Sequence, residues 1–247
     1  MVYDIMEVCL LAGRIMLQSG AETYRVEDTM ERIARAFGVR EAHCFVTPTG
    51  IIFSIESKEP TKTKLVRITE RTTDLHKVAL VNGVSRRITN QELDIEKAYE
   101  ALKEVEETKL TYSTMIQIMA AALSSGCFLI MFNGSWNDFL PACLTGGLGY
   151  TSFMYFHRMV PIKFFSEFIG SMIIGLLSYL FILSGLGVEL DKIIIGSVMP
   201  LVPGLLLTNA VRDLMAGHLV SGISKGAEAL LTAFAIGSGI AVVLSFL

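Results

Sequence analysis

The chain has 247 residues, of which 52% are hydrophobic, and its mean hydropathy of +0.53 is high for a soluble protein of this size. Its formal net charge is only −3, so the composition indicates neither a nucleic-acid partner nor an acidic tail. Residues 1–110 nevertheless hold 34 of the 45 Asp, Glu, Lys and Arg residues. Because a charge in hydrocarbon is costly, this division predicts a cytoplasmic domain over 1–110 and a membrane domain in the lipid bilayer over 111–247.

The N-terminal part has the pattern of a small α+β domain with the element order α-α-β-β-β-α-α. The expected helices cover about 3–18, 22–37, 73–83 and 91–108, the last starting at an Asn90 cap, and the expected strands cover 41–47, 51–56 and 63–69. The chain does not start like a secretory signal, because Asp4 and Glu7 precede the first apolar run and Arg14 interrupts it. We therefore expect this domain to stay in the cytoplasm.

A dense group of glycine and polar residues lies between the first two expected helices. It contains Gly13, Arg14, Ser19, Gly20, Ala21, Glu22, Thr23 and Arg25. Gly20 can adopt the left-handed conformation that ends a helix, and Ser19 with Glu22 has the spacing of a capping box. Helix packing with capping explains the group, and a ligand or gating site explains it as well, so both interpretations stay open.

The sequence lacks the common signatures of catalysis and of metal binding. The N-terminal domain has no phosphate loop, HExxH or GxSxG, and His43 and His76 stand alone in register. His157 and His218 have no partner at metal-ligand spacing, and the four cysteines form no CxxC pair. We therefore expect a protein that is not an enzyme and that uses no cofactor and no metal.

Five segments of the membrane domain are long and apolar enough to be predicted as transmembrane helices. They lie near 114–132, 139–156, 164–184, 193–211 and 228–247. Basic residues such as Lys103, Arg158 and Arg212 lie near alternate ends of these segments, which predicts a cytoplasmic N-terminus and an outer C-terminus in the cell membrane. Since many transporters consist of paired repeats, the odd number of helices also suggests a second, separate part.

The fourth expected helix is interrupted by Pro200, Pro203 and Gly204. Proline removes a backbone donor and clashes with the preceding turn, so we expect the helix to break near the centre of the bilayer. Unwound backbone at that depth requires a protein interior or a wet cavity. The half-helix starting near Gly204 would then point free N–H groups at a carboxylate. A simple proline kink that aids packing is the other interpretation.

Polar side chains follow this interruption at helical spacing. They are Thr208, Asn209, Arg212 and Asp213, with Ser221 and Glu228 further along the chain. Arg212 offers a bidentate fork for a carboxylate, and Asp213 could hold an ammonium group or a proton. Alternatively, Arg212 and Asp213 mark only the cytoplasmic membrane edge, and Glu228 only complements a helix dipole.

Two stretches of the chain resemble the bacterial threonine/serine exporter family. Residues 10–29 are similar to the N-terminal signature of the family. Its membrane signature is similar to Pro203–Gly204, Thr208–Asn209–Ala210, Arg212–Asp213, Ser221–Gly222 and Gly226–Ala227–Glu228. The resemblance covers essentially the whole chain. His218 departs from the pattern, because an acid is common at this position, and a titrating histidine could substitute for it.

The resemblance implies a secondary-active, proton-driven exporter of small polar acids, such as threonine and serine or dicarboxylates including succinate. It implies that this chain is the larger subunit of a split, two-chain exporter with a short all-membrane partner, and it leaves a further oligomeric state open. The implied substrate site comprises Pro203, Gly204, Thr208, Asn209, Arg212, Asp213 and Ser221, with Asp213 and Glu228 coupling to protons. One rival function is an enzyme whose soluble domain does chemistry near Arg14, Glu22 and Arg25. The other is a membrane-anchored sensor whose soluble domain binds a ligand.

Overall fold

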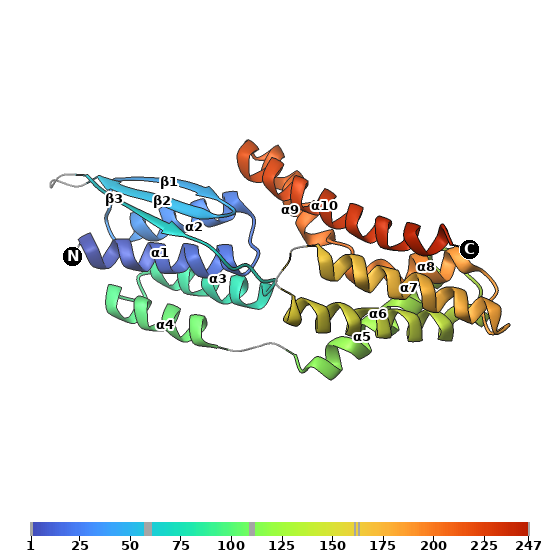
Figure 1. The fold of residues 1–247 in the computed structure, drawn as a ribbon. Helices are drawn as coiled ribbons and strands as arrows, with labels where there is room; N and C mark the ends of the chain where they lie inside the picture. Colours follow the sequence, from blue (N-terminus) through green and yellow to red (C-terminus); the bar gives the residue numbers. More distant parts are fainter. Residues whose placement is uncertain (1, 57–60, 109–111, 161, 163, 247) are drawn as a thin grey trace. The chain divides into compact units, whose positions relative to one another are not determined.

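A computed structural model describes residues 2–56, 61–108, 112–160, 162 and 164–246 (Figure 1). Its contacts divide the chain into two compact units. The first comprises Met1–Thr111 with Leu205–Gly226, and the second comprises Tyr112–Gly204 with Ala227–Leu247. The domain boundary predicted at residue 110 falls outside the described residues. By its contacts Leu205–Gly226 groups with the N-terminal unit, whereas the sequence placed this segment in the membrane domain.

The first unit combines an antiparallel sheet with helices, in the α-α-β-β-β-α-α order that the sequence predicts. The elements are α1 (Val2–Gln18), α2 (Thr23–Ala36), β1 (Glu41–Thr47), β2 (Gly50–Glu56), β3 (Lys62–Arg67), α3 (Leu75–Thr89) and α4 (Ile95–Glu107). Strand β2 lies between β1 and β3, and Phe45, Ile52 and Leu65 are paired across the three strands. Helix α9 (Gly204–Met215) and the first turns of α10 (Leu219–Leu244) complete this unit.

Helix α1 lies at the centre of the first unit, with the sheet on one side and α4 on the other (Figure 1). Its residues Val8, Ala12 and Met16 are fully buried. Helices α1 and α2 approach closely, because a Cβ atom at Gly13 would lie 2.3 Å from the sulfur of Met30. Burial of apolar surface is the dominant favourable term in folding. The apolar packing of α1 and α2 therefore positions the turn that connects them.

Two helix ends in the first unit differ from the prediction. Helix α3 continues beyond residue 83, because Val84 and Ile88 extend its buried face. Asn90 consequently follows α3 and does not cap α4. The N-terminus of α4 is capped instead by Asp94, whose carboxylate accepts a hydrogen bond from the N–H of Lys97.

The capping box predicted at the start of α2 is not formed. Gly20 does adopt the left-handed conformation, with φ of +86°, but the side chain of Glu22 makes no capping hydrogen bond. The N–H of Thr23, the first residue of α2, donates instead to the carboxylate of Asp213 in α9. The free N-terminal N–H is thus satisfied by a residue 190 positions away, which local spacing cannot reveal.

The second unit is built from helices that pack closely through glycine. They are α5 (Thr114–Met131), α6 (Phe139–Met159), α7 (Phe165–Leu183), α8 (Leu190–Val198) and the remainder of α10. A Cβ atom at Gly146 would lie 2.0 Å from the Ser125 hydroxyl, and one at Gly149 would lie 2.3 Å from Ile174. Small residues at helix crossings are typical of membrane bundles.

Within the described residues, α5, α7 and α10 are long and apolar enough to cross a membrane. The number of spans rises to four if the bent pair Leu190–Leu201 and Gly204–Met215 forms a single span. These helices support a multi-pass membrane protein. The number of five spans stays a prediction.

The fourth predicted segment consists of separate helical pieces. Helix α8 is followed by a short 3-10 helix over Met199–Leu201, and α9 begins after Pro203. The prediction that the last helix begins at Glu228 is wrong, because α10 already begins at Leu219. Gly217, with φ of +87°, lets the chain turn directly after α9, and Glu228 therefore lies inside α10.

Candidate functional site

The candidate site is a cluster of polar residues in the first unit, where the α1–α2 turn meets α9 and the first turns of α10. We call it the polar cluster, and it comprises Gly20, Ala21, Glu22, Thr23, Asn209, Arg212, Asp213 and Lys225. Gly20 and Gly217 have left-handed backbones that reverse the chain after α1 and α9. These two turns bring residues from the two ends of the sequence into contact.

Asp213 and Lys225 form a buried ion pair at the centre of the polar cluster. The Nζ atom of Lys225 lies 2.7 Å from Oδ2 of Asp213. Thr23 donates two further hydrogen bonds to this carboxylate, from its N–H and from its hydroxyl, each at 2.9 Å. A buried charge is tolerated only when it is paired and fully hydrogen-bonded. Asp213 satisfies this condition and also places a negative charge at the positive end of the α2 dipole.

Glu22 lies between two arginines from different helices. Its Oε1 atom accepts a hydrogen bond of 2.6 Å from Nη1 of Arg212, and its Oε2 atom lies 3.4 Å from Nε of Arg25. Burial alone would raise the pKa of the Glu22 carboxyl, but a backbone N–H and the two guanidinium groups outweigh burial and lower it. The two arginines on either side of Glu22 therefore favour the ionised form of its carboxyl group.

Four consecutive residues of the α1–α2 turn contact α9 or α10. The carbonyl oxygen of Gly20 accepts a hydrogen bond of 2.8 Å from Asn209, and that of Ala21 accepts one of 3.4 Å from Lys225. Glu22 and Thr23 bind Arg212 and Asp213 as described above. The polar face of α9 is thus complementary to this one turn.

A second group of contacts lies at the edge of β1, next to the polar cluster. The N–H of Val46 donates to Oε1 of Glu27 at 2.8 Å, and its carbonyl oxygen accepts from the Ser221 hydroxyl at 3.1 Å. Nδ1 of His218 lies 3.7 Å from Oε2 of Glu27. Burial raises the pKa of Glu27, and the nearby charges of Glu31 and Asp213 act in the same direction. Glu27 and Ser221 together cover the open backbone edge of β1.

The structure brings together several residues that the sequence singled out and separates others from them. Asn209 binds Gly20, Arg212 binds Glu22 beside Arg25, and Asp213 binds Thr23. Ser221 binds Val46 of β1 instead. Arg14 instead pairs with Glu106 of α4 at 2.6 Å, and it lines a hollow of about 240 Å³ with Glu7, Leu10, Leu11, Lys64, Val66 and Tyr99. The group of residues 13–25 is therefore divided between two places.

Three residues of this region were not predicted from the sequence, namely Lys225, Glu27 and His218 as an ion-pair partner. Lys225 was missed because the last helix was expected to begin only at 228, which placed this cation in a loop. Glu27 and His218 gave no local signal, because their contact depends on how α2 packs against the turn after α9.

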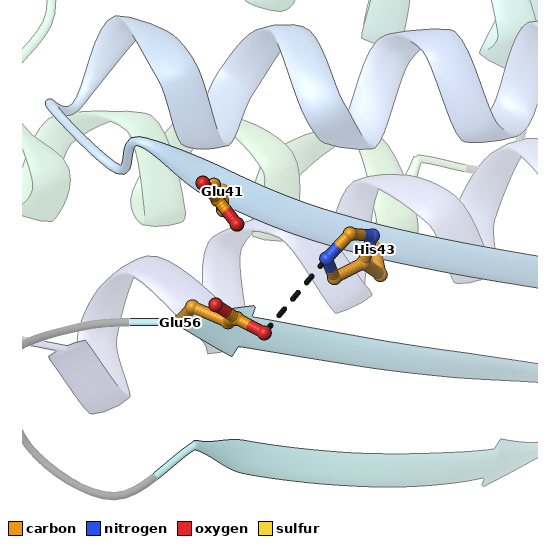
Figure 2. A group of neighbouring side chains, drawn as sticks. All are labelled: Glu41, His43 and Glu56. Atoms are coloured by element: carbon orange, nitrogen blue, oxygen red, sulfur yellow. Dashed lines mark ion pairs between the residues drawn. The ribbon is translucent and has the colours of Figure 1, made fainter.

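His43 is not isolated, although the sequence suggested that it is. Figure 2 shows Glu41, His43 and Glu56 at the end of the β1–β2 pair. Their nearest ligand atoms all lie within 4.8 Å of one another, and all three residues are exposed. Glu41 and Glu56 are direct cross-strand partners, which places two like charges opposite each other. This group is separate from the polar cluster.

Comparison with known proteins yields one family and several relatives. A family model described as "Putative threonine/serine exporter" matches residues 7–247. "Probable succinate transporter subunit YjjP" of Klebsiella aerogenes is 26% identical over 98% of this chain and 93% of its own length. The protein of the same name from Escherichia coli is 24% identical over 98% of this chain and 94% of its own length.

A longer relative matches as well. "Threonine/serine exporter" of Corynebacterium glutamicum is 25% identical over 97% of this chain but only 50% of its own length. The chain thus spans almost all of the two relatives described as subunits and half of the protein described as an exporter. No solved structure shows a significant match.

Proposed function

Because this chain belongs to the threonine/serine exporter family, we propose that it is the larger subunit of a secondary-active exporter of small polar acids. The names of its relatives specify threonine, serine and succinate, which share a small size and a carboxylate. The apolar helices α5, α7 and α10 agree with a protein of the cell membrane. In this proposal the N-terminus is cytoplasmic and the C-terminus lies outside.

The proposed substrate site contains Arg212 as the group that binds the carboxylate, with Asn209 beside it. Pro203, Gly204, Thr208, Asp213 and Ser221 are the other residues that we assign to it. The observation that carries this assignment is the convergence of the two sequence signatures, since residues near 22 and near 212 form one polar cluster. Guanidinium binds a carboxylate through paired, charge-assisted hydrogen bonds.

Proton coupling would use Asp213, with Glu228 as a second acid further along α10. Asp213 suits this role because it is buried and is paired with a single cation, Lys225. A proton on Asp213 would remove the negative charge that Lys225 requires. The contacts between α9, α10 and the α1–α2 turn would then weaken, which links protonation to a conformational change.

A second, short all-membrane subunit would complete the exporter. Two relatives of almost the same length as this chain are described as subunits, and the exporter from Corynebacterium glutamicum is about twice as long. The missing half would supply further helices that pack against α5–α8 and α10. Export should therefore require both proteins in the same membrane.

The decisive experiment measures efflux of labelled threonine, serine and succinate from cells that express the chain with and without a short partner. Arg212→Ala should abolish efflux while membrane insertion stays normal. Arg35→Ala is the matched control, because Arg35 pairs with Glu31 on the exposed face of α2, outside the polar cluster. Normal efflux by Arg212→Ala would remove the proposed substrate site.

A further inference from the structure

We propose that Glu22 is a built-in competitor of the transported acid. In this view the side chain of Glu22 occupies the carboxylate-binding position, and Arg25 is the second guanidinium of that position, beside Arg212. The substrate carboxylate has to displace Glu22 before it binds. This inference rests on the proposed export function and assigns residues to its site.

The geometry at Glu22 is that of a carboxylate-binding position. One guanidinium comes from α9 and the other from α2, and they contact different oxygen atoms of the same carboxylate. Such a pair of guanidinium groups is the arrangement that binds a free carboxylate in many recognition sites.

The exposed fractions show how a ligand could reach this position. The side chain of Glu22 is only 8% exposed, whereas those of Arg212 and Arg25 are 55% and 42% exposed. A small acid in the surrounding water can therefore contact both arginines while Glu22 is still in place. Each guanidinium carries five donors, so one carboxylate does not use all of them. Exchange can proceed stepwise, and neither arginine has to lose its carboxylate before it gains the next one.

Exchange of Glu22 for the substrate carboxylate would also change other contacts within the polar cluster. Glu22 stands between Ala21, which accepts a hydrogen bond from Lys225, and Thr23, which donates two to Asp213. Within this proposal, the turn shifts when the Glu22 side chain leaves Arg212, because that contact joins the turn to α9. Substrate binding would therefore loosen the contacts of Asp213 and Lys225 with the turn, and this couples the carboxylate position to the buried ion pair.

The test is a binding measurement on the purified full-length protein in lipid nanodiscs, with succinate and threonine as ligands. Glu22→Gln removes the competing charge and keeps the size of the side chain. Partly exposed ion pairs contribute up to about 1 kcal/mol, so this variant should bind the acid roughly threefold to fivefold more tightly. Arg25→Ala should bind it more weakly than the wild type. Glu31→Gln in α2 is the matched control, and it should leave the affinity unchanged.

The outcomes separate this inference from the export function. If the wild type binds neither acid, the proposed substrate site is wrong. If the wild type binds an acid and Glu22→Gln binds it equally well or more weakly, the competition is wrong and the export function stands. Should Glu22→Gln fail to fold, Glu22→Asp takes its place, because it keeps the charge but reaches less far toward Arg212. Tighter binding by Glu22→Asp supports the inference, and unchanged or weaker binding overturns it.

Discussion

Asp213 and Thr23 are 190 positions apart in the chain, yet the Asp213 carboxylate accepts both the N–H and the hydroxyl of Thr23, each at 2.9 Å. This contact replaces the local cap that α2 lacks. It also joins the N-terminal signature of the family to its membrane signature. The N-terminal part of the chain is thus bonded to the segment that carries the polar residues of the predicted transport site.

The first prediction concerns the buried pair of Asp213 and Lys225. Asp213→Asn leaves the ammonium of Lys225 buried without a counter-ion, and breaking such a pair costs about 3–5 kcal/mol. We expect a marked fall in the thermal unfolding temperature of the purified protein. Hydrogen exchange at Thr23 should also become faster, because its N–H loses a charged acceptor.

The double variant Asp213→Asn with Lys225→Met provides the control for this prediction. It removes both charges, so no buried ion is left unpaired, and part of the lost stability should return. Equal destabilisation in the single and double variants would show that the loss comes from packing and not from the charge.

The second prediction concerns the pH dependence at Glu27. Burial raises the pKa of Glu27 above its ordinary value of 4.5, helped by Glu31 and Asp213 and opposed by the N–H of Val46 and by His218. The folded protein therefore binds this proton more tightly than the unfolded chain does. The resulting stabilisation is fully present below pH 4.5 and is lost as the pH rises through the folded pKa.

Glu27→Gln should consequently become more stable relative to the wild type as the pH rises from 4.5 toward neutrality. Thermal unfolding across that pH range measures the difference. The same series on a background of His218→Asn removes the neighbouring imidazole from the comparison. A difference between wild type and Glu27→Gln that does not vary with pH would contradict the raised pKa.

Local signals were enough to predict most of the first unit. Alternating residues gave the three strands, and the left-handed Gly20 gave the end of α1. Apolar runs also predicted α5, α6 and α7 as helices. These features depend on near neighbours in the chain and on burial, which periodicity reports directly.

The partners within the candidate site could not be predicted in the same way. The sequence marked Arg212 and Asp213 as charged residues at the end of a span, but it could not show that Glu22 and Thr23 bind them. The spacing of Ser19 and Glu22 predicted a capping box. Spacing alone cannot show that Asp213, from another helix, is the acceptor at the start of α2. A long-range hydrogen bond therefore explains why the capping-box prediction was wrong.

The third prediction compares two glycines in the first unit. Gly20 has φ of +86°, and a Cβ atom there would lie 3.2 Å from the carbonyl oxygen of Thr72. Gly20→Ala should therefore destabilise the protein by about 1 kcal/mol or more. Gly83 lies within α3 with open space around it, so Gly83→Ala should stabilise the protein by roughly 0.5–1 kcal/mol. Unfolding measurements that give both variants the same sign would contradict this comparison.

The fourth prediction concerns the two like charges at the end of the sheet in Figure 2. Glu41 and Glu56 are direct partners across β1 and β2, and such pairs are repulsive. Glu41→Lys turns the repulsion into attraction, and Glu41→Gln only removes it, so the lysine variant should be the more stable of the two. Both gains should amount to a few tenths of a kcal/mol, because these side chains are exposed. Salt screens exposed charges, so the difference in stability between the two variants should disappear when unfolding is measured at about 1 M salt. If the difference persists, it arises from packing and not from charge.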